Sequence, residues 1–115
     1  MKGYVQGRQR ENTIKQLFWT YGYTCFRPAA SAGGDPKSDV KPVDLIALKQ
    51  DKPTLLVQAS KRPRDVTNAE LEELKRLAAK AGATACTVTL QDGRYQSTLI
   101  ANSPQTLLLA DYLKS

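Results

Sequence analysis

The chain has 115 residues, 41% of them hydrophobic, and carries 17 basic against 11 acidic residues for a formal net charge of +6. This length suits one compact domain, and we expect residues 1–115 to form it. No apolar run is long enough to span a membrane, and the basic start of the chain is not followed by the apolar stretch of a secretory signal. The basic excess favours a polyanionic partner, with nucleic acid ahead of a membrane surface.

Histidine is absent, which excludes hydrolases with a histidine base and zinc sites built with histidine. The two cysteines form no CxxC pair, so we expect buried thiols in a reducing cytoplasm, of a microbial cell or of the host if the source is viral. No glycine-rich loop for a nucleotide cofactor is present either. If the chain is an enzyme, its chemistry must therefore come from carboxylates, amides, hydroxyls and lysines, the groups that suit a hard cation such as Mg²⁺.

The first half of the chain predicts one helix and three strands. Residues 6–21 form an amphipathic pattern with apolar side chains at helical spacing, and a short strand follows at residues 24–26. Residues 29–42 are rich in glycine, proline and polar side chains, which is typical of a loop long enough to carry function. Residues 43–48 and 54–60 predict two strands joined by a polar turn.

The second half predicts a helix, two strands and a final helix. Thr67 and Glu70 fit a capping box at the start of the helix, and Gly82 stands where its C-terminal cap is expected. Residues 84–90 and 95–101 predict a strand pair, and Ser103-Pro104 suits the start of a helix. The order αβββαββα predicts an α/β fold with a central mixed five-stranded sheet flanked by helices. The apolar segment 107–113 is a candidate subunit contact.

Two carboxylates and one amide stand where polar groups need partners. Glu11 lies at the edge of the apolar stripe of the first helix, and either an ion pair or a metal site accounts for it. Asp44 stands at the start of an apolar strand, where aspartate is disfavoured. It is either a metal ligand or a turn residue just outside the strand ladder. Gln58 sits at the centre of the next strand and must find hydrogen-bond partners or a ligand.

Several short pieces of the chain form an ordered pattern: Arg10-Glu11-Asn12, Gly22-Tyr23, Arg27, Ala30-Ser31-Ala32-Gly33, Val43-Asp44-Leu45-Ile46-Ala47 and Val57-Gln58-Ala59-Ser60-Lys61. In order and spacing these pieces resemble the archaeal-type Holliday junction resolvases, which belong to the PD-(D/E)xK nuclease superfamily. The motifs cover residues 2–61, and beyond them only the order of elements agrees.

The resemblance implies a restriction-endonuclease-like fold and a homodimer that cuts symmetric strands of a four-way DNA junction with Mg²⁺, for which Mn²⁺ is expected to substitute. By position, Asp44 would be the central metal ligand and Gln58 the second. Glu11 would join the metal site by orienting the attacking water. Ser31 would match a loop serine near the scissile phosphate. Glutamine in place of glutamate removes a negative charge, which predicts a lower cation affinity.

The chain departs from the family at the catalytic lysine. The family pattern puts lysine at position 60, where this sequence has Ser60, with Lys61 one residue later. One step along a strand reverses the face, so Lys61 serves only if the strand bulges or ends early. We expect Lys61 to be re-aimed inward; the alternatives are a loop lysine, Lys37 or Lys41, or a weak enzyme.

Basic residues flank the candidate site in the sequence and predict contacts to DNA phosphates: Lys2, Arg8, Arg10, Lys37, Lys41, Arg62 and Arg64. A surface of this kind reads DNA shape, and its affinity falls steeply with salt. The sequence thus favours a structure-selective junction endonuclease. The alternatives are a related nuclease with another DNA substrate, a junction-binding module with a weak or decayed site, and a structural domain.

Overall fold

A computed structural model describes residues 2–28, 42–62, 65–91, 94–99 and 105–114. In these residues the chain runs from helix α1 (Lys2–Thr20) through the strands β1 (Thr24–Phe26), β2 (Leu45–Leu48) and β3 (Leu55–Ser60) to helix α2 (Asn68–Ala81). The chain continues through the strands β4 (Thr84–Gln91), β5 (Arg94–Leu99) and β6 (Gln105–Leu108) to the short helix α3 (Leu109–Lys114).

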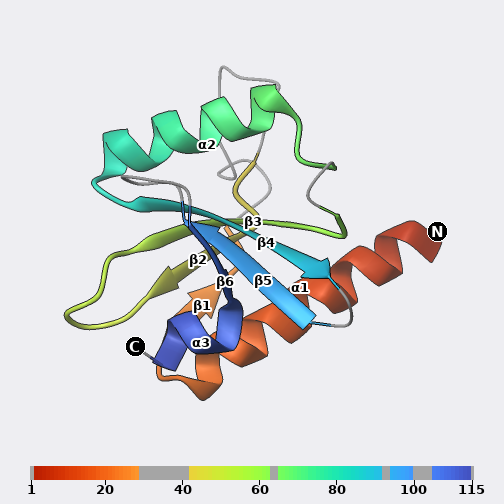
Figure 1. The fold of residues 1–115 in the computed structure, drawn as a ribbon, viewed down its shortest axis with the longest axis horizontal. Helices are drawn as coiled ribbons and strands as arrows, with labels where there is room; N and C mark the ends of the chain where they lie inside the picture. The colour runs from red at the N-terminus through yellow and green to blue at the C-terminus, as the bar shows by residue number, and fades with distance from the viewer. Residues whose placement is uncertain (1, 29–41, 63–64, 92–93, 100–104, 115) are drawn as a thin grey trace.

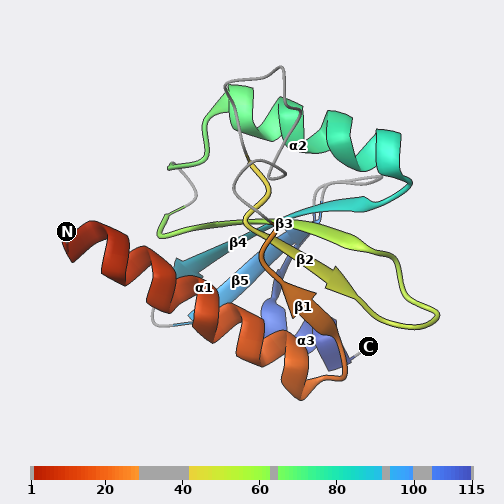
Figure 2. The same cartoon turned by 180° about the vertical axis from the view of Figure 1, so that it is seen from behind.

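The strands form one six-stranded sheet in the order β1-β2-β3-β4-β5-β6. Among the strands that the structure describes, β3 and β4 are the one parallel pair, and the other neighbouring pairs are antiparallel. Parallel neighbours need a long crossover, which α2 supplies between β3 and β4. The start of α2 therefore lies near the end of β3, on the same side of the molecule (Figure 2).

Helices cover both faces of the sheet: α2 lies on one face, and α1 and α3 lie on the other (Figures 1 and 2). Ile14 and Phe18 of α1 are fully buried in the larger core cluster with the α3 residues Leu109 and Leu113. Leu74 of α2 centres a smaller cluster on the opposite face. Alternate residues of β3 therefore point into two different cores.

The helix ends follow local sequence chemistry. The Thr67 hydroxyl accepts a hydrogen bond from the Glu70 backbone N–H, and the Glu70 carboxylate accepts one from the Thr67 backbone N–H. Gly82 ends α2 with a φ of 68°, in the left-handed region that glycine tolerates best. Both ends of α2 were predicted from the sequence and are confirmed.

The α/β architecture and the mixed sheet are confirmed, but the prediction of five strands is wrong at the C-terminal end. Residues 105–108, assigned by the sequence to the final helix, pair with β5 as a sixth strand. This pairing gives hydrogen-bond partners to backbone N–H and C=O groups along the edge of β5. The stability gained from these bonds outweighs the local preference for a helix after Ser103-Pro104. Only Leu109–Lys114 remain helical.

The described residues contain no helix with the length and apolar character needed to cross a membrane. Cys25 and Cys86 are both buried and free, as the sequence predicts.

Candidate active site

Asp44 lies immediately before β2 and is fastened to β3 by two hydrogen bonds. Its backbone N–H donates to the Val57 carbonyl at 2.8 Å, and its Oδ2 accepts from the Ala59 backbone N–H at 2.8 Å. The second bond uses the aspartate side chain in place of a ladder partner. The carboxyl is thereby held in a defined orientation at the end of the sheet where β3 stops.

The surroundings of Asp44 are rich in charge. Burial raises the pKa of Asp44 to about 6, against the lowering effect of the Ala59 hydrogen bond. The negative charges of Glu11 and Glu70 contribute to this raised pKa, while the positive charge of Arg10 opposes it. Glu11 and Arg10 come from α1 and Glu70 from α2, so both helices bring charge to one carboxyl.

Gln58 is buried at 6% exposure near the end of β3, beside Thr87 of β4. Its Nε2 donates to Glu70 Oε2 at 3.4 Å. Its Oε1 is buried and has no hydrogen-bond partner among the described residues. A buried carbonyl oxygen without a partner is costly, and a bound cation is one way to satisfy it.

Glu70 is the residue of this cluster that sequence analysis missed. The sequence accounted for Glu70 by the capping box alone, a role that the structure confirms through Oε1. Its second oxygen, Oε2, faces Gln58. The available signal was topological: a helix that follows β3 directly must begin near the end of β3, so an acid in its first turn lies near residues 58–60.

Glu11 forms an ion pair with Arg27, whose Nε lies 2.9 Å from Glu11 Oε1. The contact lacks the geometry of a hydrogen bond, because Arg27 Nε has no hydrogen-bond partner among the described residues. The pair connects α1 to the residue that follows β1. Of the alternatives that the sequence left open for Glu11, an ion pair is therefore present, and its partner is Arg27. The acid also lies close enough to Asp44 to raise its pKa.

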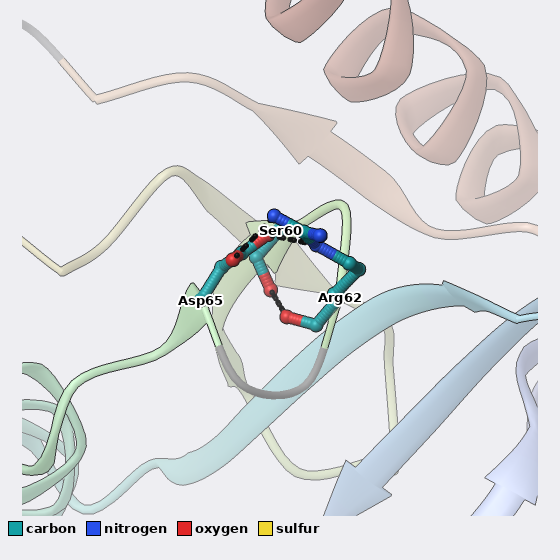
Figure 3. Close-up of polar contacts among 3 residues, drawn as sticks. All are labelled: Ser60, Arg62 and Asp65. Carbon is teal, nitrogen blue, oxygen red and sulfur yellow. Dashed lines mark hydrogen bonds and ion pairs between the residues drawn. The ribbon is translucent and has the colours of Figure 1, made fainter.

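Polar contacts among Ser60, Arg62 and Asp65 shape the segment that follows β3 (Figure 3). The strand ends at Ser60, whose buried hydroxyl donates to the Arg62 carbonyl at 3.1 Å. Lys61 comes after the strand, so strand alternation no longer assigns it a face. Its side chain is exposed and makes no hydrogen bond or ion pair with another described residue, so the expectation that Lys61 is re-aimed inward is wrong. Arg62, an expected phosphate ligand, is paired with Asp65 at 3.3 Å.

The remaining expected residues are placed only in part. Arg10 of α1 is half-buried and acts on Asp44. Lys2 and Arg8 lie in α1, and for these two residues only the backbone is described. Four expected residues lie outside the described residues: Ser31, Lys37, Lys41 and Arg64.

The donor set fits a small hard cation better than a metal that needs many side chains. No group of three or more histidine, cysteine, aspartate or glutamate side chains suited to a metal lies within the described parts of the chain. Mg²⁺ is usually held by one or two protein oxygens together with waters and substrate phosphates. Asp44 and the unpartnered Gln58 Oε1 provide such oxygens.

One apolar cavity of about 220 Å³ lies elsewhere in the molecule. Its walls come from α1, β5, β6 and α3, and they contain none of the candidate site residues: Leu17, Arg94, Tyr95, Leu108, Leu109 and Ala110. The charge and the orphaned oxygen are therefore better guides to the active site than this cavity.

Comparisons with known proteins identify the family and the fold of the chain. The family model described as archaeal Holliday junction resolvase (Hjc) matches residues 2–104, well beyond the motifs at residues 2–61. The solved structure of Hjc from Archaeoglobus fulgidus, a Holliday junction resolvase from an archaeal hyperthermophile, superposes with a TM-score of 0.62 at 17% identity. The superposition covers 91% of this chain and 90% of that one, and at this identity it shows a shared fold. The comparison with curated proteins gave no match. With the family model matching most of its length, the chain belongs to the archaeal Holliday junction resolvase family and is a junction-resolving nuclease.

Proposed function

We propose that this chain cuts four-way DNA junctions at a divalent-cation site held by Asp44 and Gln58, with Mg²⁺ as the ion and Mn²⁺ as a substitute. The observation that carries the proposal is the buried Gln58 Oε1 without a partner, on the strand to which the Asp44 carboxyl is fastened. Family membership supplies the junction and the nuclease activity. The cation is inferred from the oxygen donors and from the absence of any histidine in the chain.

The proposed division of labour follows from where each group lies. A bound Mg²⁺ supplies positive charge that acidifies water and neutralises the phosphate. Asp44, oriented by the Ala59 N–H, and Gln58 would hold that charge at the end of β3. Glu11, from the opposite helix, would orient the attacking water and accept its proton.

The positive side chains around the site are proposed to contact the phosphates of DNA. Lys61 is exposed just beyond the strand end, so it is free to approach a scissile phosphate once DNA is bound. We extend the same proposal to Ser31 and to the basic residues on both sides of the site: Lys2, Arg8, Arg10, Lys37, Lys41, Arg62 and Arg64. These contacts predict binding that weakens as salt rises.

Paired symmetric cuts across a two-fold junction need two active sites, so we propose that residues 1–115 act as one nuclease domain within a homodimer. The contact expected at residues 107–113 needs correction, because Leu109 and Leu113 are buried in the core of the chain itself. The two free, buried thiols suit the reducing cytoplasm as the place of action.

The test is cleavage of a labelled four-way junction and of a matching linear duplex with Mg²⁺, Mn²⁺ or chelator. The variant Asp44→Asn removes the proposed ligand. Asp51→Asn is the matched control, because Asp51 lies in the exposed turn after β2 with a φ of 64°, a conformation that asparagine also adopts.

Paired nicks in the junction alone, lost with chelator and in Asp44→Asn but kept in Asp51→Asn, support the proposal. Cutting of both substrates would discard junction selectivity and favour a related nuclease. Junction binding without cutting under either ion would overturn the catalytic part. The buried Ser60 at the family's lysine position favours that second candidate, a junction-binding protein with a weak site.

A further inference from the structure

A chain of three residues links the first turn of α2 to the candidate cation site. The Thr67 backbone N–H and hydroxyl donate to Glu70 Oε1 at 3.1 and 3.0 Å. Glu70 Oε2 then accepts from Gln58 Nε2 at 3.4 Å. The Gln58 amide ends this chain, and its other atom, Oε1, is buried without a partner.

The direction of these bonds decides how the Gln58 amide is turned. An ionised carboxylate only accepts hydrogen bonds, whereas the two ends of an amide differ: the nitrogen donates and the oxygen accepts. Only Nε2 can face Glu70, so Oε1 must point away from it. The two Thr67 donors hold Glu70 in place, which makes the preference a fixed feature of the fold.

We propose that Glu70 is a positioning residue for the cation site: it holds the Gln58 amide so that Oε1, and not Nε2, faces the cation. This inference rests on the proposed function. The capping box alone does not require Glu70 Oε2 to contact β3, since the cap is satisfied through Oε1.

Glu70 also restores charge to the site. A glutamine at position 58 carries no negative charge, whereas Glu70 places a carboxylate 3.4 Å from the amide nitrogen. Glu70 acts on Asp44 as well, since its negative charge raises the pKa of that carboxyl. The charge missing from β3 is thus supplied from the first turn of the following helix.

The test is a double-mutant cycle with Glu70→Gln and Gln58→Met, read by calorimetric titration of the whole chain with Mn²⁺ alone. Glutamine is also accepted in a capping box, so Glu70→Gln keeps the start of α2. Methionine removes the amide that Glu70 is inferred to orient, at similar volume. Glu72→Gln is the matched control, because it removes one negative charge from the same helix at a side chain that is 72% exposed.

We expect Glu70→Gln to weaken Mn²⁺ affinity by about tenfold in the native chain, as loss of a group that orients a ligand commonly does. In the Gln58→Met background the same change should have less than about a twofold effect. Glu72→Gln should also stay within about twofold. Without any cation, the side-chain amide signal of Gln58 in a ¹⁵N spectrum should shift in Glu70→Gln and stay in place in Glu72→Gln.

Equal losses of affinity in both backgrounds would overturn the positioning role and leave Glu70 as a general source of charge. No loss in either background, with an unmoved amide signal, would overturn it entirely. Failure of the proposed function gives a different result: the native chain and Asp44→Asn would then bind Mn²⁺ equally weakly, while the Gln58 amide would still report its contact with Glu70.

Discussion

Asp44 Oδ2 lies 2.8 Å from the backbone nitrogen of Ala59 and accepts its hydrogen bond, so one carboxyl joins the start of β2 to the end of β3. The bond favours the ionised carboxylate, yet burial dominates and raises the pKa of Asp44 to about 6. The neighbouring acids Glu11 and Glu70 act in the same direction as burial. Without a cation, the ionised form of Asp44 is therefore a cost to the fold.

Replacing Asp44 by asparagine is expected to stabilise the cation-free protein while abolishing cleavage. The folded pKa of Asp44, about 6, exceeds the ordinary value of 3.8. The native protein therefore loses stability as pH rises from about 4 to 6. At pH 8 the free energy of unfolding of Asp44→Asn should be higher by about 1–2 kcal/mol. Denaturant unfolding in chelator measures this. The gain should shrink as pH falls below 6, and a gain that is the same at pH 5 and pH 8 would show that charge is not its cause.

Replacing Gln58 by glutamate should raise Mn²⁺ affinity and lower the stability of the cation-free protein. The new carboxylate adds negative charge beside Asp44, but it also faces Glu70 across the present 3.4 Å contact, where two carboxylates repel. We expect a loss of about 1–3 kcal/mol in chelator at pH 8, largely recovered in saturating Mn²⁺. Thermal unfolding with and without the ion measures both effects. Full stability in chelator would contradict the closeness of residues 58 and 70.

Replacing Glu11 by glutamine should reduce junction cleavage by about 100-fold or more while leaving junction binding within about threefold. The substitution also breaks the ion pair with Arg27, a partly exposed contact worth no more than about 1 kcal/mol. Arg27→Gln breaks the same pair but keeps the carboxylate, and it should keep cleavage within about tenfold of the native rate. Equal losses in single-turnover assays of the two variants would assign the effect to the ion pair.

Tyr23 and Tyr112 share a hydrogen bond that ties α3 to the segment between α1 and β1. The pKa of Tyr112 is raised from 10.0 to about 12, mainly by burial, with Tyr23 acting in the same direction. Since the folded pKa exceeds the unfolded one, stability from this tyrosine is complete below pH 10 and is lost as pH rises towards 12. Tyr112→Phe should cost about 1 kcal/mol at pH 8 and flatten the decline above pH 10. Denaturant unfolding between pH 8 and 11 measures the slope, and an unchanged slope would rule out Tyr112 as its source.

The sequence alone predicted those features of this protein that depend on interactions between residues close together in the chain. The capping box of Thr67 and Glu70 and the glycine cap at Gly82 depend on residues within one or two turns, so their patterns identified both ends of α2. Alternation located β3, which carries Gln58, and β2, which Asp44 directly precedes, because burial on a sheet has a period of two residues. A carboxylate and an amide at apolar strand positions then indicated a polar site.

The tertiary structure decided what depends on contacts between distant segments. The strand β6 forms because β5 offers it a backbone edge, which the helix signal at Ser103-Pro104 could not reveal. Arg27 as the partner of Glu11, and Glu70 as the partner of Gln58, both depend on where helices meet strand ends. Spacing within a helix or strand determines which side chains share a face. The partner of a side chain on another element depends on how the elements pack together. The sequence therefore singled out Asp44 and Gln58 as candidate donors, and the fold determined which residues hold each side chain in place.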